Sequence, residues 1–550
     1  MNIDDKKIKQ ILLDGNYVTA EDISKAETAI KTTQGTVVEW LLSSEIINKD
    51  LLGQAIAESY KVSYSDLNTY KPSQEQVRLL PEEVAKQFHA VIFRQTDKEL
   101  TIATDDPTQA ELTKKLKTIF KGKKIVVTFS FTEDVEESFI HYLKTLETRF
   151  NEIIKQQKRI APEIIDEIVD DAVAYRASDI HLEPQEKEVI VRFRIDGVMQ
   201  EAGRIPKDYY GNILNRIKVQ AQLPIDEHFS AQDGAARQVR EKYTVDMRIS
   251  ILPTLNGEKV VIRLLSQYVR SFSFSDLGLS KHDQELLLKA INKPFGMILV
   301  TGPTGSGKTT SLYALLKLLN NPTVNITTIE DPVEYKMPGV NQIQVNSQTN
   351  LTFAKGLRSI VRQDPDIILV GEIRDQETAE TAVNAALTGH LLLSTFHAND
   401  AATAVPRLLD MDIEPFLLSS TLVVLIAQRL VRKICDQCRF STTLSKEDVK
   451  KTIPQDAQKY FSGKHIVLYK GKGCASCGNT GFRGRTAIYE FIEVTPELQE
   501  LILQHPSTAQ IWKIARKQGS VTLFEDGIEK VKNGITTLEE LLRMAEPPKF

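Results

Sequence analysis

One short loop constrains the fold of this chain more than any other feature. Residues 301–310 read Thr-Gly-Pro-Thr-Gly-Ser-Gly-Lys-Thr-Thr, between the apolar run 297–300 and the helix-forming run 311–316. A G-x-x-x-x-G-K-T loop between a strand and a helix is typical of a P-loop, whose backbone N–H groups surround phosphate oxygens at the positive end of the helix dipole. The alternative is a glycine-rich turn with a surface lysine, which would not require a strand before the loop and a helix after it. The sequence therefore predicts a nucleoside triphosphate site.

The loop also assigns roles to individual side chains. Lys308 is expected to reach the β and γ phosphates of ATP. The Thr309 hydroxyl is expected to be a ligand of the Mg²⁺ that accompanies the nucleotide, because Mg²⁺ prefers oxygen ligands. The residues expected to line the nucleotide are Gly302, Pro303, Thr304, Gly305, Ser306, Gly307, Lys308, Thr309 and Thr310.

The composition is that of an ordinary globular protein. The chain has 550 residues and a formal net charge of -4, and its length is enough for about three or four domains. Lysine and arginine are interspersed with acids, without the basic stripe of a nucleic-acid motor, so we expect no nucleic-acid partner. The first residues show no export signal, and the longest strongly apolar stretch, residues 416–427, is too short to span a bilayer. We therefore expect a cytoplasmic protein without a membrane anchor of its own.

All four cysteines fall into two C-x-x-C pairs, Cys435 with Cys438 and Cys474 with Cys477. In a cytosolic chain, two such pairs are typical of a tetrahedral four-thiolate Zn²⁺ site, since disulfides are disfavoured there. Four protein ligands leave no open position for a substrate, so the site would be structural. The alternatives are four unrelated buried thiols or redox pairs.

The patterns along the chain divide it into five parts. Residues 1–145 form an N-terminal accessory domain, in which 12–23 aligns with 41–52 as a tandem helical repeat and an α/β part follows, with a strand at 99–104. Residues 160–272 predict an α+β domain, with a strand at 189–195, a hairpin turn at Asp196-Gly197, and strands at 245–252 and 259–265. The other parts are an ATPase core at 275–430, a cysteine subdomain at 431–490 and a C-terminal helical region at 491–550.

Strands and helices alternate in the core. The expected strands are 296–300, 325–329, 367–370 and 390–396, separated by helices at 309–319, 352–363 and 376–388. Such alternation predicts a mainly parallel α/β sheet that is covered on both faces and that binds its ligand at the carboxyl ends of the strands.

Polar residues follow these strands. Glu330 is expected on a loop beside the phosphates, where it would hold the metal or the attacking water. Glu372 ends the third strand and would orient and deprotonate that water. Gly371 stands where such a strand usually has an aspartate, so direct protein ligation of Mg²⁺ would be sparse. His397 ends the fourth strand and would sense the γ phosphate; a structural histidine is the alternative.

Three arginines, Arg358, Arg362 and Arg374, are expected around this cluster. Guanidinium groups stabilise charge on a transferred phosphoryl group, and a neighbouring domain or subunit can supply one. The alternative is ordinary ion pairing with nearby acids.

Several segments together resemble the secretion and pilus assembly ATPases, the hexameric motors of type II secretion and type IV pili. The resemblance runs from about residue 163 to the C-terminus. The segments that carry it are 178–184 (Ser-Asp-Ile-His-Leu-Glu-Pro), 192–197 (Arg-Phe-Arg-Ile-Asp-Gly), 301–310, 329–334, 357–375, the segment around His397, 428–432 (Gln-Arg-Leu-Val-Arg), both cysteine pairs and 480–485.

The resemblance implies a RecA-like P-loop core, preceded by the α+β domain and by the N-terminal domain, with a small zinc subdomain. It implies a homo-hexamer that binds ATP between the second domain and the core, with Glu372 as the general base. It also implies that Arg248 and Arg263 contact the phosphates.

The chain departs from the family in two places. The family commonly has Pro-Gln-Asp-Gly-Arg where residues 231–235 read Ala-Gln-Asp-Gly-Ala, so an arginine contact is lost or moved to Arg237. The N-terminal region resembles a tandem-helix domain that binds cyclic-di-GMP in some relatives. Its Arg-Leu-Gly signatures are replaced here by residues 8–10 and 36–38, so we expect an adaptor to a partner rather than a dinucleotide site.

The leading hypothesis is an ATP-driven motor of type IV pilus assembly that acts on an inner-membrane platform protein and so lies at the inner face of the membrane. A type II secretion ATPase is the alternative. Pilus retraction motors look similar in the core but lack the long N-terminal region and the paired cysteines. From other classes, a DNA-translocating ATPase and a non-hydrolysing nucleotide-gated scaffold remain open.

Overall fold

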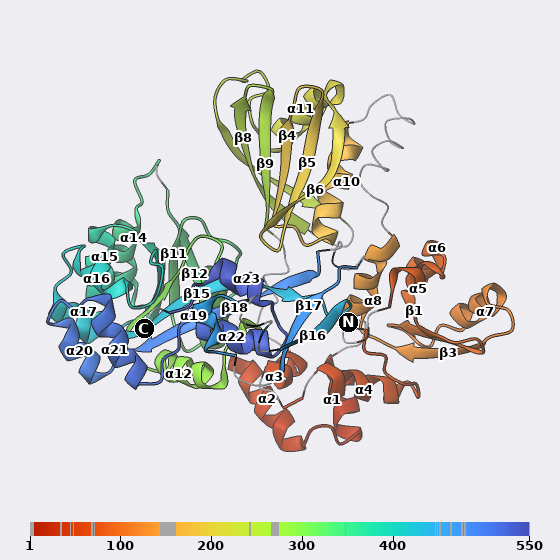
Figure 1. Ribbon diagram of the computed structural model, residues 1–550, viewed down its shortest axis with the longest axis horizontal. Coiled ribbons are helices and arrows are strands. Elements are labelled where there is room, and N and C mark those ends of the chain that lie inside the picture. Colours follow the sequence, from red (N-terminus) through yellow and green to blue (C-terminus); the bar gives the residue numbers. More distant parts are fainter. Residues whose placement is uncertain are drawn as a thin grey trace. The chain divides into compact units, whose positions relative to one another are not determined.

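The chain divides into two compact units, Ile56–Ser271 and Asn2–Ala55 with Phe272–Phe550. The protein is known from a computed structural model (Figure 1). It describes residues 5–32, 36–43, 46–47, 49–67, 70, 72–142, 161–240, 244–265, 274–346, 348–445, 447, 449, 453–461, 465–474, 477 and 480–548.

Each copy of the N-terminal repeat forms two helices. The first copy contains α1 (Asp5–Asp14) and α2 (Ala20–Thr32), and the second contains α3 (Val37–Ser43) and α4 (Lys49–Ser59). Leu12 and Leu41, which the repeat aligns, are both fully buried. The equivalent apolar positions of the two copies thus serve the same packing role.

A small three-stranded sheet follows the repeat. Its strands lie in the order β1-β2-β3, with β1 and β2 antiparallel and β2 and β3 parallel. Helix α7 makes the crossover that a parallel pair requires. The elements are α5 (Gln74–Arg78), α6 (Glu82–Gln87), β1 (Ala90–Gln95), β2 (Glu99–Thr104), α7 (Ala110–Ile119), β3 (Lys124–Phe129) and α8 (Thr132–Ser138).

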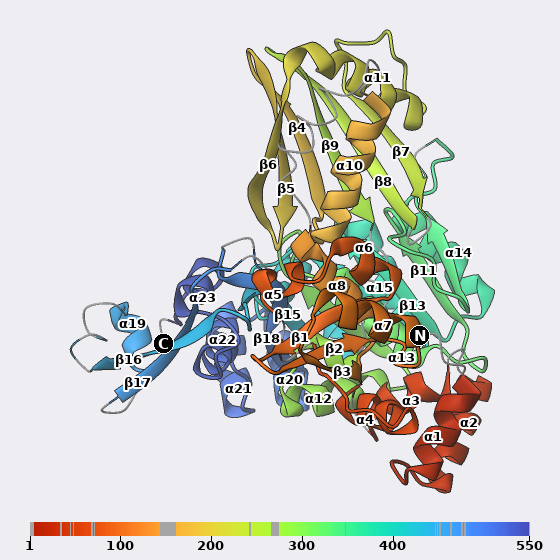
Figure 2. The ribbon, with the colours of Figure 1, turned by 90° about the vertical axis from the view of Figure 1, so that its right-hand side faces the viewer.

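The second sheet is a six-stranded antiparallel sheet in the order β6-β5-β4-β9-β8-β7. Its strands alternate buried and half-buried residues, because α10 and α11 cover one face and leave the other polar (Figure 2). Asp196 (φ 50°) and Gly197 (φ 84°) make the expected hairpin turn. The elements are α10 (Ala161–Ala174), β4 (Asp179–Pro184), β5 (Glu188–Ile195), β6 (Val198–Pro206), α11 (Tyr210–Gln220), β7 (Gln232–Val239), β8 (Thr244–Thr254) and β9 (Gly257–Leu265).

The core contains the predicted parallel α/β sheet, in the order β12-β11-β13-β14-β10-β15-β18. Only the edge pair β15 and β18 is antiparallel. Four of its strands match the sequence expectation, whereas β12, β15 and β18 were not anticipated. The strands are β10 (Gly296–Thr301), β11 (Ile326–Glu330), β12 (Val340–Gln344), β13 (Ile367–Ile373), β14 (Leu391–Phe396), β15 (Leu422–Ile434) and β18 (Phe482–Glu493).

Helices cover both faces of this sheet, as the alternation predicts. Ile298 and Val300 of β10 pack with α12 (Lys281–Ile291) and α13 (Lys308–Leu319). Met297 and Leu299 point to the other face and share a core with helices on that side. Those helices are α14 (Phe353–Ile360), α15 (Gln376–Leu387), α16 (Ala404–Leu409), α17 (Pro415–Thr421), α20 (Pro496–Ile502), α21 (Thr508–Lys517), α22 (Leu523–Lys532) and α23 (Leu538–Met544).

The cysteine-rich segment is continuous with the core sheet. Strand β15 crosses residue 430, so the boundary expected between 430 and 431 lies inside a strand. The segment adds a two-stranded sheet of β16 (Arg439–Ser445) and β17 (His465–Gly471), together with α19 (Gln455–Gln458). Among the described residues, no helix combines the length and the hydropathy needed to cross a membrane.

Candidate functional site

The phosphate-binding loop lies between the end of β10 and the start of α13, as predicted. Gly302, Gly305 and Gly307 have φ angles of 144°, 78° and 90°, which favour glycine. A Cβ on Gly302 would lie 2.5 Å from the Gln428 carbonyl oxygen, and one on Gly307 would lie 2.8 Å from Gln428 Nε2. These two glycines are therefore required by close packing as well as by backbone conformation.

Lys308 is the first residue of α13, and its side chain folds back against this loop. Its Nζ donates hydrogen bonds to the carbonyl oxygens of Gly302 (2.8 Å) and Pro303 (3.1 Å). Burial lowers the pKa of Lys308, and the nearby Glu372 carboxylate opposes that shift. The ammonium group is therefore held against the loop that is expected to carry the phosphates.

The other loop side chains are divided between buried and exposed positions. The Ser306 hydroxyl oxygen is buried and has no hydrogen-bond partner in the described part of the chain. Buried polar atoms normally have a partner, so this hydroxyl fits a site where a polar ligand binds. Thr304 and Thr309 are exposed. The backbone and Ser306 fit a phosphate group, and an exposed Thr309 hydroxyl at the first turn of α13 fits a Mg²⁺ ligand.

Three of the predicted site residues lie together at the carboxyl ends of β13 and β14. Glu372 Oε1 is 2.5 Å from Arg374 Nη2, and Glu372 Oε2 is 3.1 Å from His397 Nε2. The Glu372 side chain is 13% exposed. Arg407 hydrogen-bonds the His397 carbonyl oxygen. A carboxylate in this position has one charged partner and one titratable partner, and both are available to orient it.

Hydroxyl groups of β14 fix the two strand ends against each other. Ser394 Oγ donates to the Val370 carbonyl oxygen (2.8 Å), and Thr395 Oγ1 donates to the Gly371 carbonyl oxygen (2.6 Å). These bonds lie one and two residues before Glu372. The position of Glu372 is therefore set by the sheet and not by a free loop.

Glu330 differs from the sequence expectation in its placement. It is the last residue of β11 and is 3% exposed, whereas a position on a loop was expected. Its carboxylate accepts hydrogen bonds from Tyr313, from Thr328 Oγ1 (2.6 Å) and from Gln342 Nε2 (3.4 Å). Burial raises the pKa of Glu330, and these donors oppose that rise. The strand continues through residue 330 because Glu330 pairs in register with Gln344 of β12.

The missing aspartate at position 371 has a steric explanation. A Cβ on Gly371 would lie 3.2 Å from the Cα of Glu330 and 3.3 Å from the Ile329 carbonyl oxygen. The backbones of β11 and β13 approach too closely there for a side chain to fit without displacement. Glu330 is therefore the neighbour of Gly371 on the adjacent strand.

The three core arginines do not gather around Glu372. Arg374 contacts Glu372, but Arg358 Nη2 pairs with Glu377 Oε1 of α15 at 2.8 Å. Arg362 donates to the Arg358 carbonyl oxygen of its own helical segment at 2.7 Å. Both are exposed. Arg358 thus makes the ordinary surface ion pair that the sequence left as the alternative.

Arg248 and Arg263 lie in the other unit, as register partners on β8 and β9. Arg263 Nε donates to Asp179 Oδ1 at 3.0 Å on the polar face of that sheet. Arg237, the substitute considered for the altered turn, pairs with Asp246 at 2.5 Å. Contact of Arg248 or Arg263 with a nucleotide stays a prediction.

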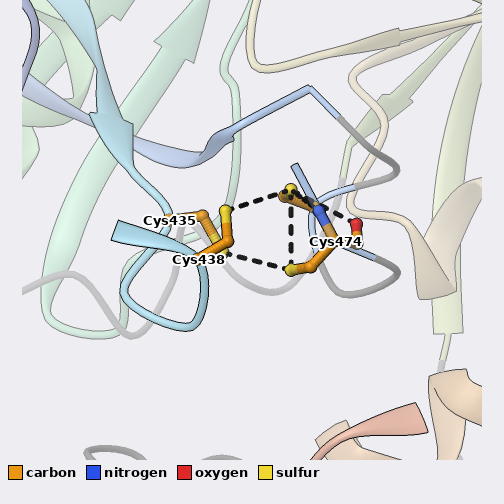
Figure 3. Close-up of side chains that lie close together, drawn as sticks. Cys435, Cys438 and Cys474 are labelled. Carbon is orange, nitrogen blue, oxygen red and sulfur yellow. Dashed lines mark hydrogen bonds between the residues drawn. The ribbon is translucent and has the colours of Figure 1, made fainter. Parts of the chain in front are cut away.

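The four cysteines converge into one cluster, and Figure 3 labels Cys435, Cys438 and Cys474 of it. The Sγ atoms of Cys435 and Cys474 are 3.8 Å apart, those of Cys438 and Cys477 are 3.9 Å apart, and those of Cys474 and Cys477 are 3.7 Å apart. A tetrahedral site with Zn–S bonds of about 2.3 Å has S–S edges of about 3.8 Å, whereas a disulfide needs about 2.0 Å. The geometry therefore fits Zn²⁺ and does not fit disulfides.

The surroundings of Cys477 favour a thiolate. The backbone N–H groups of Cys474 (3.2 Å) and Gly481 (3.3 Å) donate to its Sγ. The neighbouring Cys435 thiol and these N–H groups lower the pKa of Cys477. Thiolates are the form that binds Zn²⁺, so this group is prepared for a metal.

We expect the double change Cys435→Ser with Cys474→Ser to remove about one zinc ion per chain, because two hydroxyls do not replace two thiolates. Metal analysis of the purified protein measures this directly. The Asp436→Asn variant, which alters an exposed acid between the first two cysteines, should keep its zinc. Metal retained after the double change would end the zinc assignment.

A buried glutamate is hydrogen-bonded to the backbone of the segment that follows His397. Glu490 of β18 is 3% exposed, and its Oε1 accepts a hydrogen bond from the Ala401 N–H at 2.8 Å. Burial raises the pKa of Glu490 to about 8; Asp400 adds to the rise, and Arg516 opposes it. The folded protein therefore keeps a proton on Glu490 that the unfolded chain releases from about pH 4.5.

The stability contributed at Glu490 should fall as the pH rises from about 4.5 to about 8, by roughly 1.4 kcal/mol per pH unit, because only the unfolded state ionises in that interval. Glu490→Gln cannot ionise, so it should flatten this dependence. Thermal unfolding at about pH 6 and about pH 8 measures the difference. Equal losses of stability in the parent protein and the variant would contradict the assignment.

The fold and the loop define the class of this protein, which is a P-loop ATPase with a RecA-like core. The chain belongs to the Type II/IV secretion system protein family, whose model matches residues 155–543. The MshEN domain model matches residues 60–149. This second match covers the three-stranded sheet and lies after the tandem helical repeat.

Relatives carry two kinds of names. The Type IV pilus assembly ATPase PilB of Myxococcus xanthus is 36% identical, over 99% of this chain and 100% of its own length. The Type IV pilus assembly ATPase PilB of Thermus thermophilus is 37% identical over 92% of this chain. The aligned part covers only 59% of the Thermus thermophilus protein. The Type II secretion system protein E of Pseudomonas aeruginosa is 45% identical over 72% of this chain and 77% of its own length.

A solved structure supports the fold. The Legionella pneumophila ATPase DotB superposes with a TM-score of 0.52 at 19% identity and covers 71% of this chain and 97% of its own. At this identity the likeness shows a shared fold and nothing about the substrate.

Proposed function

We propose that this protein is the ATP-hydrolysing motor of type IV pilus assembly. The observation that carries the proposal is the extent of the alignments. The relatives named for pilus assembly from Myxococcus xanthus and Acinetobacter baylyi align with 99% and 97% of the chain. The type II secretion proteins of Pseudomonas aeruginosa and Vibrio cholerae each align with 72%. The N-terminal part therefore favours the assembly branch.

The geometry supports a division of roles in hydrolysis. Lys308 neutralises the β and γ phosphates, and the loop N–H groups hold them. Mg²⁺, held by Thr309 and water, would supply further positive charge at the phosphates. Glu372 accepts a proton from the attacking water, while Arg374 and His397 orient its carboxylate.

Glu330 has a different role in this proposal. Its hydrogen bond from Tyr313 ties the P-loop helix α13 to β11, and its bond from Gln342 ties β11 to β12. It thereby holds the loop and the strand ends in register. Direct contact of Glu330 with metal or water stays a prediction. Arg358 and Arg362, both exposed, are candidates for reaching the nucleotide of a neighbouring subunit.

The assembly and location follow from the same proposal. We expect a cytoplasmic homo-hexamer that binds an inner-membrane platform protein and contacts the membrane only through that partner, without a nucleic-acid partner. The five-part domain division remains part of the proposal, apart from the boundary between 430 and 431, which strand β15 crosses. The zinc site is structural in it, since four thiolates leave no position for a substrate.

The test uses a strain that lacks this gene and carries it again as the parent form or as Glu372→Gln. The parent form should restore surface pili, counted by electron microscopy, and Glu372→Gln should not. Restored secretion of exoproteins without pili would transfer the proposal to type II secretion, the second candidate, which the 45% identity to the Pseudomonas aeruginosa protein favours.

Purified protein separates the remaining classes. Phosphate release that rises with the platform protein supports the motor. Release stimulated by DNA alone would favour a DNA-translocating ATPase. No release under any condition would leave a nucleotide-gated scaffold.

A further inference from the structure

Strand β15 lies next to β10, the strand that leads into the phosphate-binding loop. It pairs in parallel with β10, and Ala427 is the register partner of Thr301. Gln428 follows Ala427 and is 2% exposed. Its carbonyl oxygen lies against Gly302 and its Nε2 against Gly307, the first and last glycines of the loop. One residue of a distant part of the sequence therefore contacts both ends of the loop.

The Gln428 side chain also holds the first turn of α13. Its Oε1 accepts a hydrogen bond from Ser311 Oγ at 2.9 Å, and both side chains are buried. Tyr489, the register partner of Gln428 on β18, donates a hydrogen bond from its hydroxyl to the Leu277 carbonyl oxygen at 3.1 Å. A buried amide with a fixed partner has one preferred orientation, because an unsatisfied polar group is costly there.

We propose that Gln428 is a positioning residue for nucleotide binding, which fixes the loop and the first turn of α13 so that the N–H groups and Lys308 converge on the phosphates. The inference deepens the proposed function and rests on it for the identity of the ligand. Gln428 acts through the loop and is not placed on the reacting atoms. The sequence singled out the segment 428–432 only as one of those that carry the family resemblance.

Removal of the amide should weaken nucleotide binding. Gln428→Met keeps the length of the side chain but leaves Ser311 without its acceptor and Gly307 without its polar neighbour. We expect the Kd for ADP to rise about tenfold, the size of one buried hydrogen bond, and KM for ATP to rise with it while kcat changes by less than about threefold. Fluorescent ADP titration and steady-state kinetics measure these values.

A double-mutant cycle isolates the bond itself. Ser311→Ala removes the donor, so the double variant should bind ADP no more weakly than Gln428→Met alone. Gln518→Met is the matched control, since Gln518 Nε2 donates to Thr495 Oγ1 at 2.5 Å between C-terminal helices. It should leave the Kd for ADP unchanged. If Gln428→Met does not fold, Ser311→Ala and the parent protein test the same bond.

An unchanged Kd for ADP in Gln428→Met and in Ser311→Ala, with only a lower thermal midpoint, would overturn the inference and leave Gln428 as a packing residue. ADP binding requires no hydrolysis, so the two proposals fail separately. A parent protein that binds ADP but never releases phosphate would contradict the proposed function alone. If Gln428→Met bound ADP ten times more weakly than that parent protein, the role of Gln428 would still be supported.

Discussion

Replacing Glu372 by glutamine is expected to lower kcat for ATP hydrolysis by about 10²- to 10⁴-fold, the contribution of a positioned general base. The side chain keeps its size, but an amide does not accept the proton of the attacking water. The phosphate-binding loop is untouched, so the Kd for ATP should stay within about threefold of the parent value. Phosphate release and nucleotide titration on the same preparation measure both quantities.

The chain offers a matched control for this change in Glu377→Gln. Glu377 lies five residues along the sequence, in the first turn of α15, where it pairs with the exposed Arg358. An exposed pair of this kind contributes less than about 1 kcal/mol, and it lies outside the Glu372 cluster. Its loss should leave kcat unchanged. A Glu372→Gln protein that hydrolyses ATP as fast as the Glu377→Gln protein would remove Glu372 from the mechanism.

The strands around the loop could be predicted because their signals are local. β10 is a short apolar run that ends in a glycine-rich loop, and β13 is an apolar run that ends in Gly371-Glu372. Strand β15 could not be recognised in the same way. Its first seven residues are all buried and follow a seven-residue helix directly, so the apolar run 416–427 contains the end of a helix and the start of a strand without a change in pattern.

The places of the candidate residues in the fold were predictable where a motif names the residue, and their roles stay predictions. Lys308, Glu372, His397 and the four cysteines all lie where the spacing places them. The supports of the site were not predictable, because they depend on pairings between distant segments. Tyr313 is buried against Glu330, and Gln428 is buried against the loop, but neither contact leaves a periodic or local signal.

The arginines show the limit of spacing arguments. Arg358 and Arg362 lie four residues apart, which correctly places them near each other. Spacing does not say what that helical segment faces, and here Arg358 pairs with α15. Arg374 follows Glu372 by two residues along the chain, so its contact with that carboxylate is the local one.

The loss of Lys308 should have the second large effect, on binding rather than on the chemical step alone. Its ammonium is held at the loop by the Gly302 and Pro303 carbonyl oxygens, so it is in place before a nucleotide arrives and loses little side-chain entropy on binding. Removing a buried charge-assisted contact to phosphate should raise the Kd for ATP by at least about 10²-fold.

Titration of Lys308→Ala with fluorescent ATP checks this, with Lys317→Ala as the control. Lys317 lies in the last turn of the same helix, with its ammonium 5.9 Å from the Tyr335 ring centroid. Lys317→Ala removes one positive charge, as Lys308→Ala does, but removes no contact with the loop. The two variants therefore have the same net charge. Equal affinities of the two variants for ATP would mean that the loop N–H groups bind the phosphates unaided and that Lys308 acts only in hydrolysis.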